Sequence, residues 1–276
     1  MADPPWDRFP YHRAGSALVF PRDEGWHQLL PGGIANPALS DMEWVYVNAH
    51  LREVGGEGRT FVVFAAYFTQ HLRFLVIREF DRDGRFVFCY SGSAWGVLRA
   101  SDERLDLSFS HAAGTDRWVT VLGDDGELIP FRSRLSASDD AGEFSLELDL
   151  ENMKRPYEAG GVGYLPFGAR GNFYYYSLTR LRVTGSLNLT TRGGRRESCN
   201  VEGIGWYDHQ WGPFYVTPLR VAGYEQYEWM SIQLDSGDEL LLTTVWAPSG
   251  ETPDLPAHAV LASDRVSNIT STLSTS

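Results

Sequence analysis

The sequence has little of what several large function classes need. It holds one lysine and two cysteines in 276 residues, and its formal net charge is −12. Nucleic acids and anionic membrane surfaces are bound by clustered Lys and Arg, so we expect neither as a partner. We interpret the scarcity of lysine itself as coding bias. Cys89 and Cys199 stand far apart and form no CxxC motif, which fits a reducing compartment and predicts a cytoplasmic protein.

Known catalytic motifs are also missing. The seven histidines form no HxH, HxxxH or HExxH pattern, which disfavours a metal site. No GxSxG elbow, Walker loop or GxGxxG follows a predicted strand, so hydrolase and nucleotide-binding hypotheses lack support. We therefore expect no metal and no cofactor. The longest apolar run, residues 61–68, is too short to cross a bilayer, and residues 1–15 lack the pattern of a signal peptide.

What the chain does contain is a series of short alternating segments separated by turn residues. Turns rich in Gly and Asp are predicted at residues 55–58, 81–84, 123–126, 138–142, 192–194 and 235–237. No stretch has the pattern of a long amphipathic helix, and residues 1–40, rich in proline, are predicted to be irregular. Successive hairpins predict an all-β sandwich or barrel.

The segment 43–51 leaves two alternatives open. Residues 40–43 read Ser-Asp-Met-Glu, a possible capping box that would begin a helix. The density of aromatic and β-branched residues favours a strand instead. As a strand, it presents Trp44, Tyr46, Asn48 and His50 on one face and Val45, Val47, Ala49 and Leu51 on the other.

A second aromatic segment covers residues 172–181. On a strand, Tyr174 and Tyr176 would face one side and Tyr175 the other. Tyrosine suits half-buried strands in general, so any single one can be simple packing. Four adjacent aromatic residues favour a cavity lining, in which a ligand oxygen can pair with a buried hydroxyl. The face that points inward stays open, so Tyr175 is an alternative to its neighbours.

Residues 203–214 hold the densest set of candidate functional side chains. Glycines at both flanks and Pro213 predict a bend rather than a long regular element. One hypothesis is that this bend aims Asp208, His209 and Trp211 into one cavity. The alternative is a buried Asp–His hydrogen bond at a corner between two sheets, with the tryptophans as packing. Adjacency alone is weak support, because neighbours on a strand point to opposite faces.

Three motifs resemble those of a known family. Residues 43–46, 175–187 and 205–212 are similar, in this order, to the EWWY, YYSxTRLxxxG and WMDHQWG motifs of the carotenoid 1,2-hydratase/AttH-like family of lipocalin-related proteins. The resemblance implies two lipocalin-like antiparallel β-barrels side by side, with the third motif near their junction and a ligand cavity close by. It also implies apolar, often unsaturated substrates, because members hydrate carotenoid double bonds. Relatives in polyketide pathways close rings, some of them as Diels–Alderases.

The resemblance divides the chain into three parts. Residues 1–40 would be an irregular N-terminal segment, and residues 41–204 the first barrel. Residues 205–276 would hold the junction motif and the start of a second barrel. This second barrel is expected to be incomplete here, with its missing segment supplied by residues outside this sequence or by another chain.

The resemblance and the strand alternation together suggest a site. The family's hydratases use the His and Trp of the third motif, which implies His209 and Trp211 as catalytic residues, with Asp208 beside them. The residues expected to bind substrate are Trp44, Tyr46, Asn48, Tyr174 and Tyr176.

Three functions compete for this site. The first is a cofactor-independent cyclase that holds an apolar polyketide or polyene chain in a reactive shape and changes no mass. The second is a hydratase, in which Asp208 protonates an alkene and Trp211 and Trp44 stabilise the cation. The third is a non-catalytic carrier of apolar ligands. The absence of cofactor motifs favours the cyclase, as does Gln233, which stands where a hydratase-type tyrosine would suit.

Overall fold

The protein is built almost entirely from β-strands. A computed structural model describes residues 5–37, 42–167, 171–212, 216–217, 220–221, 226–246, 253–263 and 266–272. Helix in these residues is limited to two short 3-10 elements, η1 (Arg22–Glu24) and η2 (Ala159–Gly161). The predicted all-β class is therefore confirmed. Across the same ranges we find no helix with the length and apolar character that a membrane span requires.

Strands follow one another along nearly the whole chain. In order they are β1 (Leu29–Leu30), β2 (Ile34–Ala35), β3 (Met42–Glu53), β4 (Thr60–Phe68), β5 (Leu72–Phe80), β6 (Phe86–Trp95), β7 (Val97–Ala100), β8 (Asp106–His111), β9 (Gly114–Leu122), β10 (Leu128–Ser138), β11 (Phe144–Asn152), β12 (Tyr157–Glu158), β13 (Tyr164–Phe167), β14 (Gly171–Thr190), β15 (Arg196–Gly212), β16 (Val216–Thr217), β17 (Arg220–Val221), β18 (Gln226–Gln233), β19 (Glu239–Trp246), β20 (Pro253–Ser263) and β21 (Val266–Thr272).

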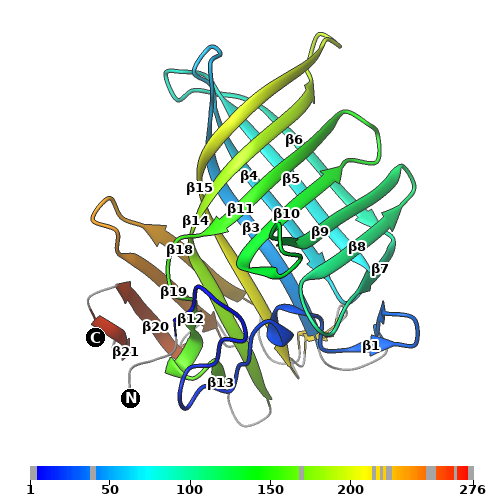
Figure 1. The fold of residues 1–276 in the computed structure, drawn as a ribbon. Helices are drawn as coiled ribbons and strands as arrows, with labels where there is room; N and C mark the ends of the chain where they lie inside the picture. Colours follow the sequence, from blue (N-terminus) through cyan, green and yellow to red (C-terminus); the bar gives the residue numbers. More distant parts are fainter. Residues whose placement is uncertain are drawn as a thin grey trace.

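Fifteen strands form one antiparallel sheet that curls into a half-barrel (Figure 1). Its order is β1-β2-β7-β8-β9-β10-β11-β14-β15-β3-β4-β5-β6, and β12 and β13 pair with β14. The chain passes from β6, at one end of this order, into β7, near the other end, through Gly96. A Cβ on Gly96 would lie 2.3 Å from the backbone oxygen of Ser110, so a glycine is needed at this close approach.

Two smaller sheets follow in the chain. β16 pairs with β17, and β18 to β21 form a four-stranded antiparallel sheet. The predicted boundary between residues 204 and 205 falls inside β15. The division into two barrel domains stays a prediction.

All six turns predicted from glycine and aspartate connect neighbouring strands. They join β3 to β4, β5 to β6, β9 to β10, β10 to β11, β14 to β15 and β18 to β19. Gly84 and Gly126 show why glycine is used, since both have positive φ angles, of 78° and 82°. The Gly and Asp clusters therefore located the hairpins correctly.

Segment 43–51 is a strand, and the helical alternative is wrong. It belongs to β3, where Val45, Val47 and Ala49 are fully buried and alternate with less buried residues. This period of two matches a pleated strand whose one face packs into the barrel. Pairing with β4 and β15 supplies the backbone hydrogen bonds of this segment, and Ser40 and Asp41 of the possible capping box lie outside the described residues.

The prediction of a bend is wrong for residues 203–212. This part of the chain is the end of β15, a continuous strand of 17 residues paired with β14 and β3. Its glycines serve close approach instead of turning. A Cβ on Gly203 would lie 2.0 Å from the backbone oxygen of His50, and one on Gly205 would lie 3.0 Å from that of Asn48. Pro213 lies outside the described residues.

Two apolar cores lie on opposite faces of the central strands. The larger one fills the half-barrel and includes Val45, Val47, Trp118, Tyr207 and Trp211. The smaller one includes Tyr175, Trp206 and Leu241, with Trp44 and Trp229 packed against it. Burial of each large apolar side chain contributes about 1.5–3 kcal/mol. The stretches 173–179 of β14 and 206–212 of β15 are therefore covered on both faces, which explains their aromatic content.

Polar contacts fasten β18 and β19 to the large sheet. Glu239 is fully buried and accepts hydrogen bonds from Arg180 Nε at 2.6 Å and from Lys154 Nζ at 2.8 Å. The Gln233 amide donates to the backbone oxygens of Thr179 and Gly205, at 2.7 and 2.8 Å, where an irregularity interrupts the pairing of β14 with β15. The chain's one lysine thus has a structural position, which its interpretation as coding bias did not foresee.

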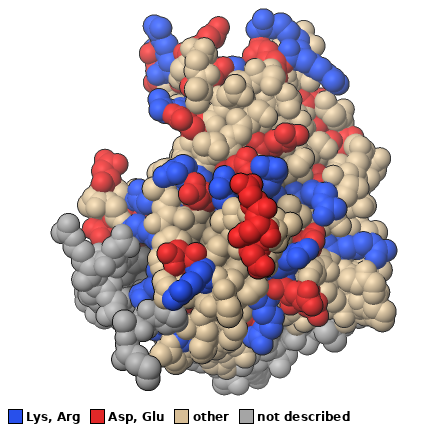
Figure 2. Space-filling model, in the orientation of Figure 1, with Lys and Arg blue, Asp and Glu red and all other residues tan. Residues whose placement is uncertain are grey.

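Acidic and basic side chains are mixed on the outer surface. Figure 2 shows both signs side by side over most of the visible face, with one run of basic side chains at its upper right end.

Candidate functional site

β15 presents the predicted catalytic residues to opposite faces. His209 and Trp211 point into the half-barrel, together with Tyr176 and Tyr174, their register partners on β14. Asp208 points outward with Tyr46, its register partner on β3. The predicted residues therefore divide into an inner group, His209, Trp211, Tyr174 and Tyr176, and an outer group, Asp208, Trp44, Tyr46 and Asn48. The eight predicted residues therefore do not line one common cavity, and their roles stay predictions.

The outer group centres on the carboxyl of Asp208, which is 1% exposed. Tyr46 and Tyr175 donate their hydroxyls to Asp208 Oδ2, the latter at 3.0 Å. Trp206 Nε1 donates to Oδ1 at 2.7 Å. Three donors from three strands thus converge on one carboxyl, which we call the outer cluster: Asp208, Tyr46, Tyr175 and Trp206.

Trp229 of β18 covers the outer cluster. Its ring meets Tyr46 and Trp206 edge to face, with centroid distances of 5.4 and 6.1 Å. Its Nε1 donates to the Tyr175 hydroxyl at 3.2 Å. The carboxyl therefore lies in an aromatic box whose far wall comes from the four-stranded sheet.

Burial raises the pKa of Asp208 to about 6, although the hydrogen bonds from its donors offset part of this effect. A carboxyl with this pKa exists in both protonation states near neutral pH. It can therefore give up a proton and take one back, which is what general acid–base chemistry requires.

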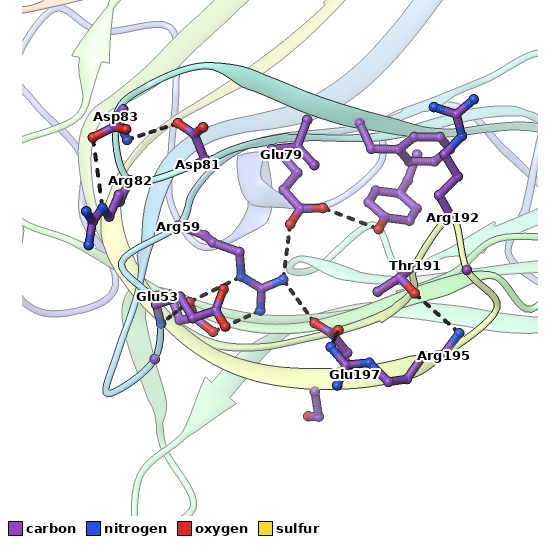
Figure 3. A pocket seen from close by; sticks show the side chains of 17 residues that line it. Glu53, Arg59, Glu79, Asp81, Arg82, Asp83, Thr191, Arg192, Arg195 and Glu197 are labelled. Atoms are coloured by element: carbon purple, nitrogen blue, oxygen red, sulfur yellow. Dashed lines mark hydrogen bonds and ion pairs between the residues drawn. The ribbon is translucent and has the colours of Figure 1, made fainter.

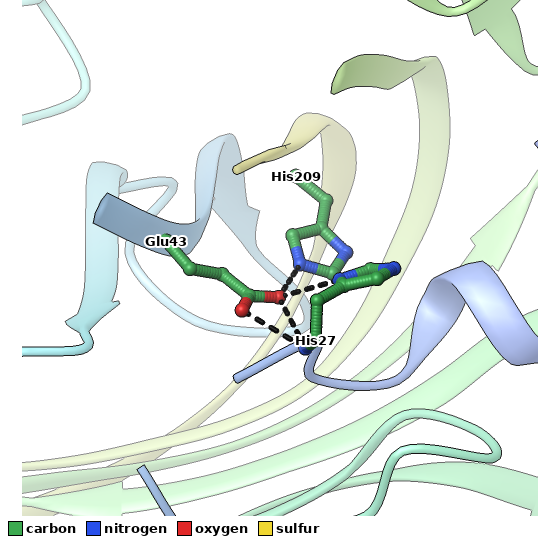
Figure 4. Close-up of side chains that lie close together, drawn as sticks. All are labelled: His27, Glu43 and His209. Carbon is green, nitrogen blue, oxygen red and sulfur yellow. Dashed lines mark hydrogen bonds and ion pairs between the residues drawn. The ribbon is translucent and has the colours of Figure 1, made fainter. Parts of the chain in front are cut away.

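A second cluster joins His209 of the inner group to His27 and Glu43 (Figure 4). Glu43 Oε1 lies 2.8 Å from His27 Nδ1 and 2.8 Å from His209 Nε2. The backbone N–H of His27 donates to Glu43 Oε2 at 2.9 Å. On its other side, His27 Nε2 lies 3.2 Å from Asp23 Oδ1. We call His27, Glu43 and His209 the inner cluster.

Aromatic rings enclose the inner cluster. His27 stacks on Trp211 with a centroid distance of 3.7 Å and an interplanar angle of 8°. Trp211 in turn stacks on Tyr174 at 5.5 Å, and Tyr176 meets His209 edge to face at 5.6 Å. The predicted inner residues therefore do lie together, as a wall around His209.

The charges of the inner cluster follow from burial and pairing. Burial alone would lower the pKa of His27, but hydrogen bonds to Asp23 and Glu43 raise it above its usual value. Burial would raise the pKa of Glu43, but hydrogen bonds from His209 and His27 lower it. For His209 burial prevails and the pKa is lowered. Burial therefore favours the neutral form of His209, whereas the two carboxylates beside His27 favour its protonated form.

The comparison with family models decides the relationship. The model of the AttH-like family matches residues 90–274. This chain belongs to the AttH-like family. The family resemblance predicted from three short motifs is thereby confirmed. No curated protein sequence matches this AttH-like chain.

Two crystal structures resemble the AttH-like chain in fold. One is of an AttH from Nitrosomonas europaea, with 20% identity and a TM-score of 0.60, covering 90% of this chain and 75% of the other. The second is of kievitone hydratase from Nectria haematococca, with 15% identity and a TM-score of 0.58, covering 90% and 71%. At these identities the likeness shows the fold.

Sequence reasoning missed His27 and did not give Glu43 a role in the site. Glu43 stands 16 residues after His27 and 166 before His209, so no short spacing connects them. The pairing of β3 with β15 brings Glu43 and His209 together. His27 comes from the N-terminal segment, which was predicted only as irregular. The AttH-like motif that begins at Glu43 was the one available signal.

A pocket of about 1150 Å³ opens elsewhere in the AttH-like structure (Figure 3). Arg59 lies in it and pairs with Glu53, Glu79 and Glu197 at 2.9, 3.0 and 3.1 Å. None of the predicted site residues lines this pocket. Because its central cation is already shared among three carboxylates, we assign no function to it.

A buried acid outside both clusters predicts a pH effect on stability. Burial raises the pKa of Glu24 from 4.5 to about 8, and its Oε2 atom has no hydrogen-bond partner among the described residues. Between these pH values the folded state keeps a proton that the unfolded chain has lost. The free energy of unfolding should therefore fall as pH rises through this window, by up to about 1.4 kcal/mol per pH unit.

Glu24→Gln removes this ionisation. In urea denaturation the variant should gain stability relative to the wild type as pH rises from 4.5 toward 8, and the difference should be smallest below pH 4.5. Glu127→Gln, in an exposed turn, is the control and should follow the wild type. Parallel curves for wild type and Glu24→Gln would show that Glu24 is not held neutral.

Proposed function

We propose that this AttH-like protein is a hydratase that adds water to a carbon–carbon double bond of an apolar substrate. The observation that carries the proposal is the outer cluster, a buried carboxyl held by Tyr46, Tyr175 and Trp206 inside an aromatic box. The fold shared with kievitone hydratase supports it. The substrate would be a small apolar molecule of the polyene or polyketide type.

In this mechanism Asp208 gives its proton to one alkene carbon and becomes a carboxylate. The positive charge that forms on the other carbon is stabilised by the electron-rich rings of Trp206, Trp229 and Tyr46. A water molecule bonds to that carbon, and its extra proton returns to Asp208. The three donors around the carboxyl hold it in place and stabilise its anionic form.

The other predicted residues receive roles that follow from their positions. Trp44 and Asn48 share the outer face with Asp208, so we propose them, with Tyr46, as substrate-binding residues. His209 and Trp211 act through the backbone of β15, because they anchor its inner face to Glu43 and His27. We propose Tyr175, rather than Tyr174 or Tyr176, as the tyrosine of β14 that faces substrate.

Cyclisation of a flexible chain in the same aromatic box is the second candidate. Gln233 favours it, because this side chain is used to bind the backbone oxygens of Thr179 and Gly205. Position 233, where a hydratase-type tyrosine would suit, therefore supplies neither an acid nor a phenol in this chain. Shape and hydrogen bonding can promote ring closure without a proton donor.

Product analysis tests both candidates. The protein is incubated in ¹⁸O-labelled water with a linear carotene and, separately, with kievitone. The products are separated, and their masses are determined by mass spectrometry. Hydration predicts a product heavier by one labelled water. A new product of unchanged mass would favour cyclisation and overturn hydration. Saturable quenching of tryptophan fluorescence by a probe that yields no product would favour the carrier hypothesis.

A further inference from the structure

We propose that the inner cluster is a binding site for one divalent transition-metal ion of the Zn²⁺ type. His27, Glu43 and His209 each offer a ligand atom, and these atoms all lie within 4.8 Å of one another (Figure 4). Two imidazoles and one carboxylate are the donor set of many zinc sites and of non-haem iron sites. The absence of short histidine spacings excludes only ligands that are close in sequence, and these three come from three separate segments.

Groups behind two of the three ligands, His27 and Glu43, hold them in a ligating orientation. His27 directs Nδ1 toward Glu43 and its opposite nitrogen, Nε2, toward Asp23 Oδ1 at 3.2 Å. A carboxylate on the far nitrogen of a histidine is the usual support of a metal ligand. The backbone N–H of His27 donates to both oxygens of Glu43, to Oε2 at 2.9 Å and to Oε1 at 3.1 Å, and Oε1 also faces both rings.

Charge also favours a cation at this place. Glu43 is fully buried, and among the described residues no Lys or Arg pairs with its carboxylate. Asp23, a second buried carboxylate, pairs with Arg22 at 3.0 Å. A buried carboxylate without a permanent cation is costly, and a dication between the rings would offset that cost.

The site has a way in and room for another ligand. The His27 side chain is 22% exposed, whereas those of Glu43 and His209 are fully buried, so an ion would enter past His27. Three protein ligands leave one position of a tetrahedral ion open to water or to an oxygen of a bound molecule. The site lies on the opposite face of β15 from Asp208, so this proposal does not rest on the proposed function.

Metal titration of the full chain tests the proposal. The protein is freed of metal with a chelator, and its tag is removed. It is then titrated with Zn²⁺ by calorimetry and with Co²⁺ by visible absorption. We expect one tight site per chain and Co²⁺ bands of a site with nitrogen and oxygen ligands. His27→Gln should weaken binding at least about 100-fold. Asp23→Asn keeps the shape of the side chain but removes the carboxylate that supports His27 and pairs with Arg22, and it should weaken binding about 10–100-fold.

The controls separate this site from surface histidines and from misfolding. His50→Gln changes an exposed histidine on β3, the strand of Glu43, and should leave the affinity unchanged. Circular dichroism and cooperative unfolding verify that each variant folds. Because His27 is the partly exposed ligand, its replacement leaves the pair of Glu43 and His209 intact. The absence of saturable binding would overturn the proposal, as would tight binding that His27→Gln leaves unchanged.

Discussion

Asp208→Asn should lower kcat for hydration by roughly 10²–10⁴-fold, the usual contribution of a positioned acid. Asparagine has nearly the same shape, and its amide oxygen can still accept from Trp206 or Tyr46. It cannot transfer a proton. The effect is measured by steady-state kinetics on a substrate that the wild-type protein hydrates, and circular dichroism verifies that the variant folds.

The control for this change is Asp149→Asn. Asp149 is a partly exposed carboxylate on β11 that pairs with Arg134 at 3.0 Å, and its loss should leave kcat unchanged. A cyclase makes a different prediction, since there Asp208 would only brace the outer cluster and its replacement would reduce the rate modestly. A loss of less than about tenfold in the asparagine variant would therefore count against proton donation.

Glu239→Ala should reduce the free energy of unfolding by roughly 3–5 kcal/mol, because it leaves Lys154 and Arg180 without their shared anion. The effect should concentrate where the four-stranded sheet meets the half-barrel. Hydrogen exchange should become faster in β18 and β19, and chemical denaturation should begin at a lower denaturant concentration.

Glu202→Ala is the matched control. Glu202 pairs with Arg52 on the surface, where the two side chains are 42% and 71% exposed, so its loss should cost less than about 1 kcal/mol. Equal destabilisation by the two substitutions would show that Glu239 does not fasten the sheets.

Local sequence was enough to predict the hairpins but not the use of every glycine. Gly84 and Gly126 sit in polar turns and have positive φ angles, as their neighbours indicate. Gly203 and Gly205 carry the same signal in sequence, yet they allow close contact with the backbone of β3. The difference depends on which strand pairs alongside, and this is long-range information that a local pattern lacks.

The site was predictable to a similar extent. Strand alternation grouped Tyr46 with Trp44 on one face of β3, as observed. The predicted bend, in contrast, would have aimed Asp208 and His209 into one cavity, whereas on β15 they point to opposite faces. Strand alternation could not foresee that Tyr175, rather than Tyr176, lies opposite Gln210 and beside Asp208, because register is set by the whole sheet. His27 comes from a segment whose position depends on contacts with the finished barrel, so no periodicity could place it.

The single lysine makes this protein unusual as a target for amine chemistry. The Lys154 side chain is only 10% exposed, and its ammonium donates to Glu239 and to the backbone oxygen of Gly237. An acylating reagent can reach this side-chain amine only after β18 and β19 have moved away and the ammonium has lost a proton. The yield of acylated Lys154 would thus report how often the four-stranded sheet detaches, without any engineered label.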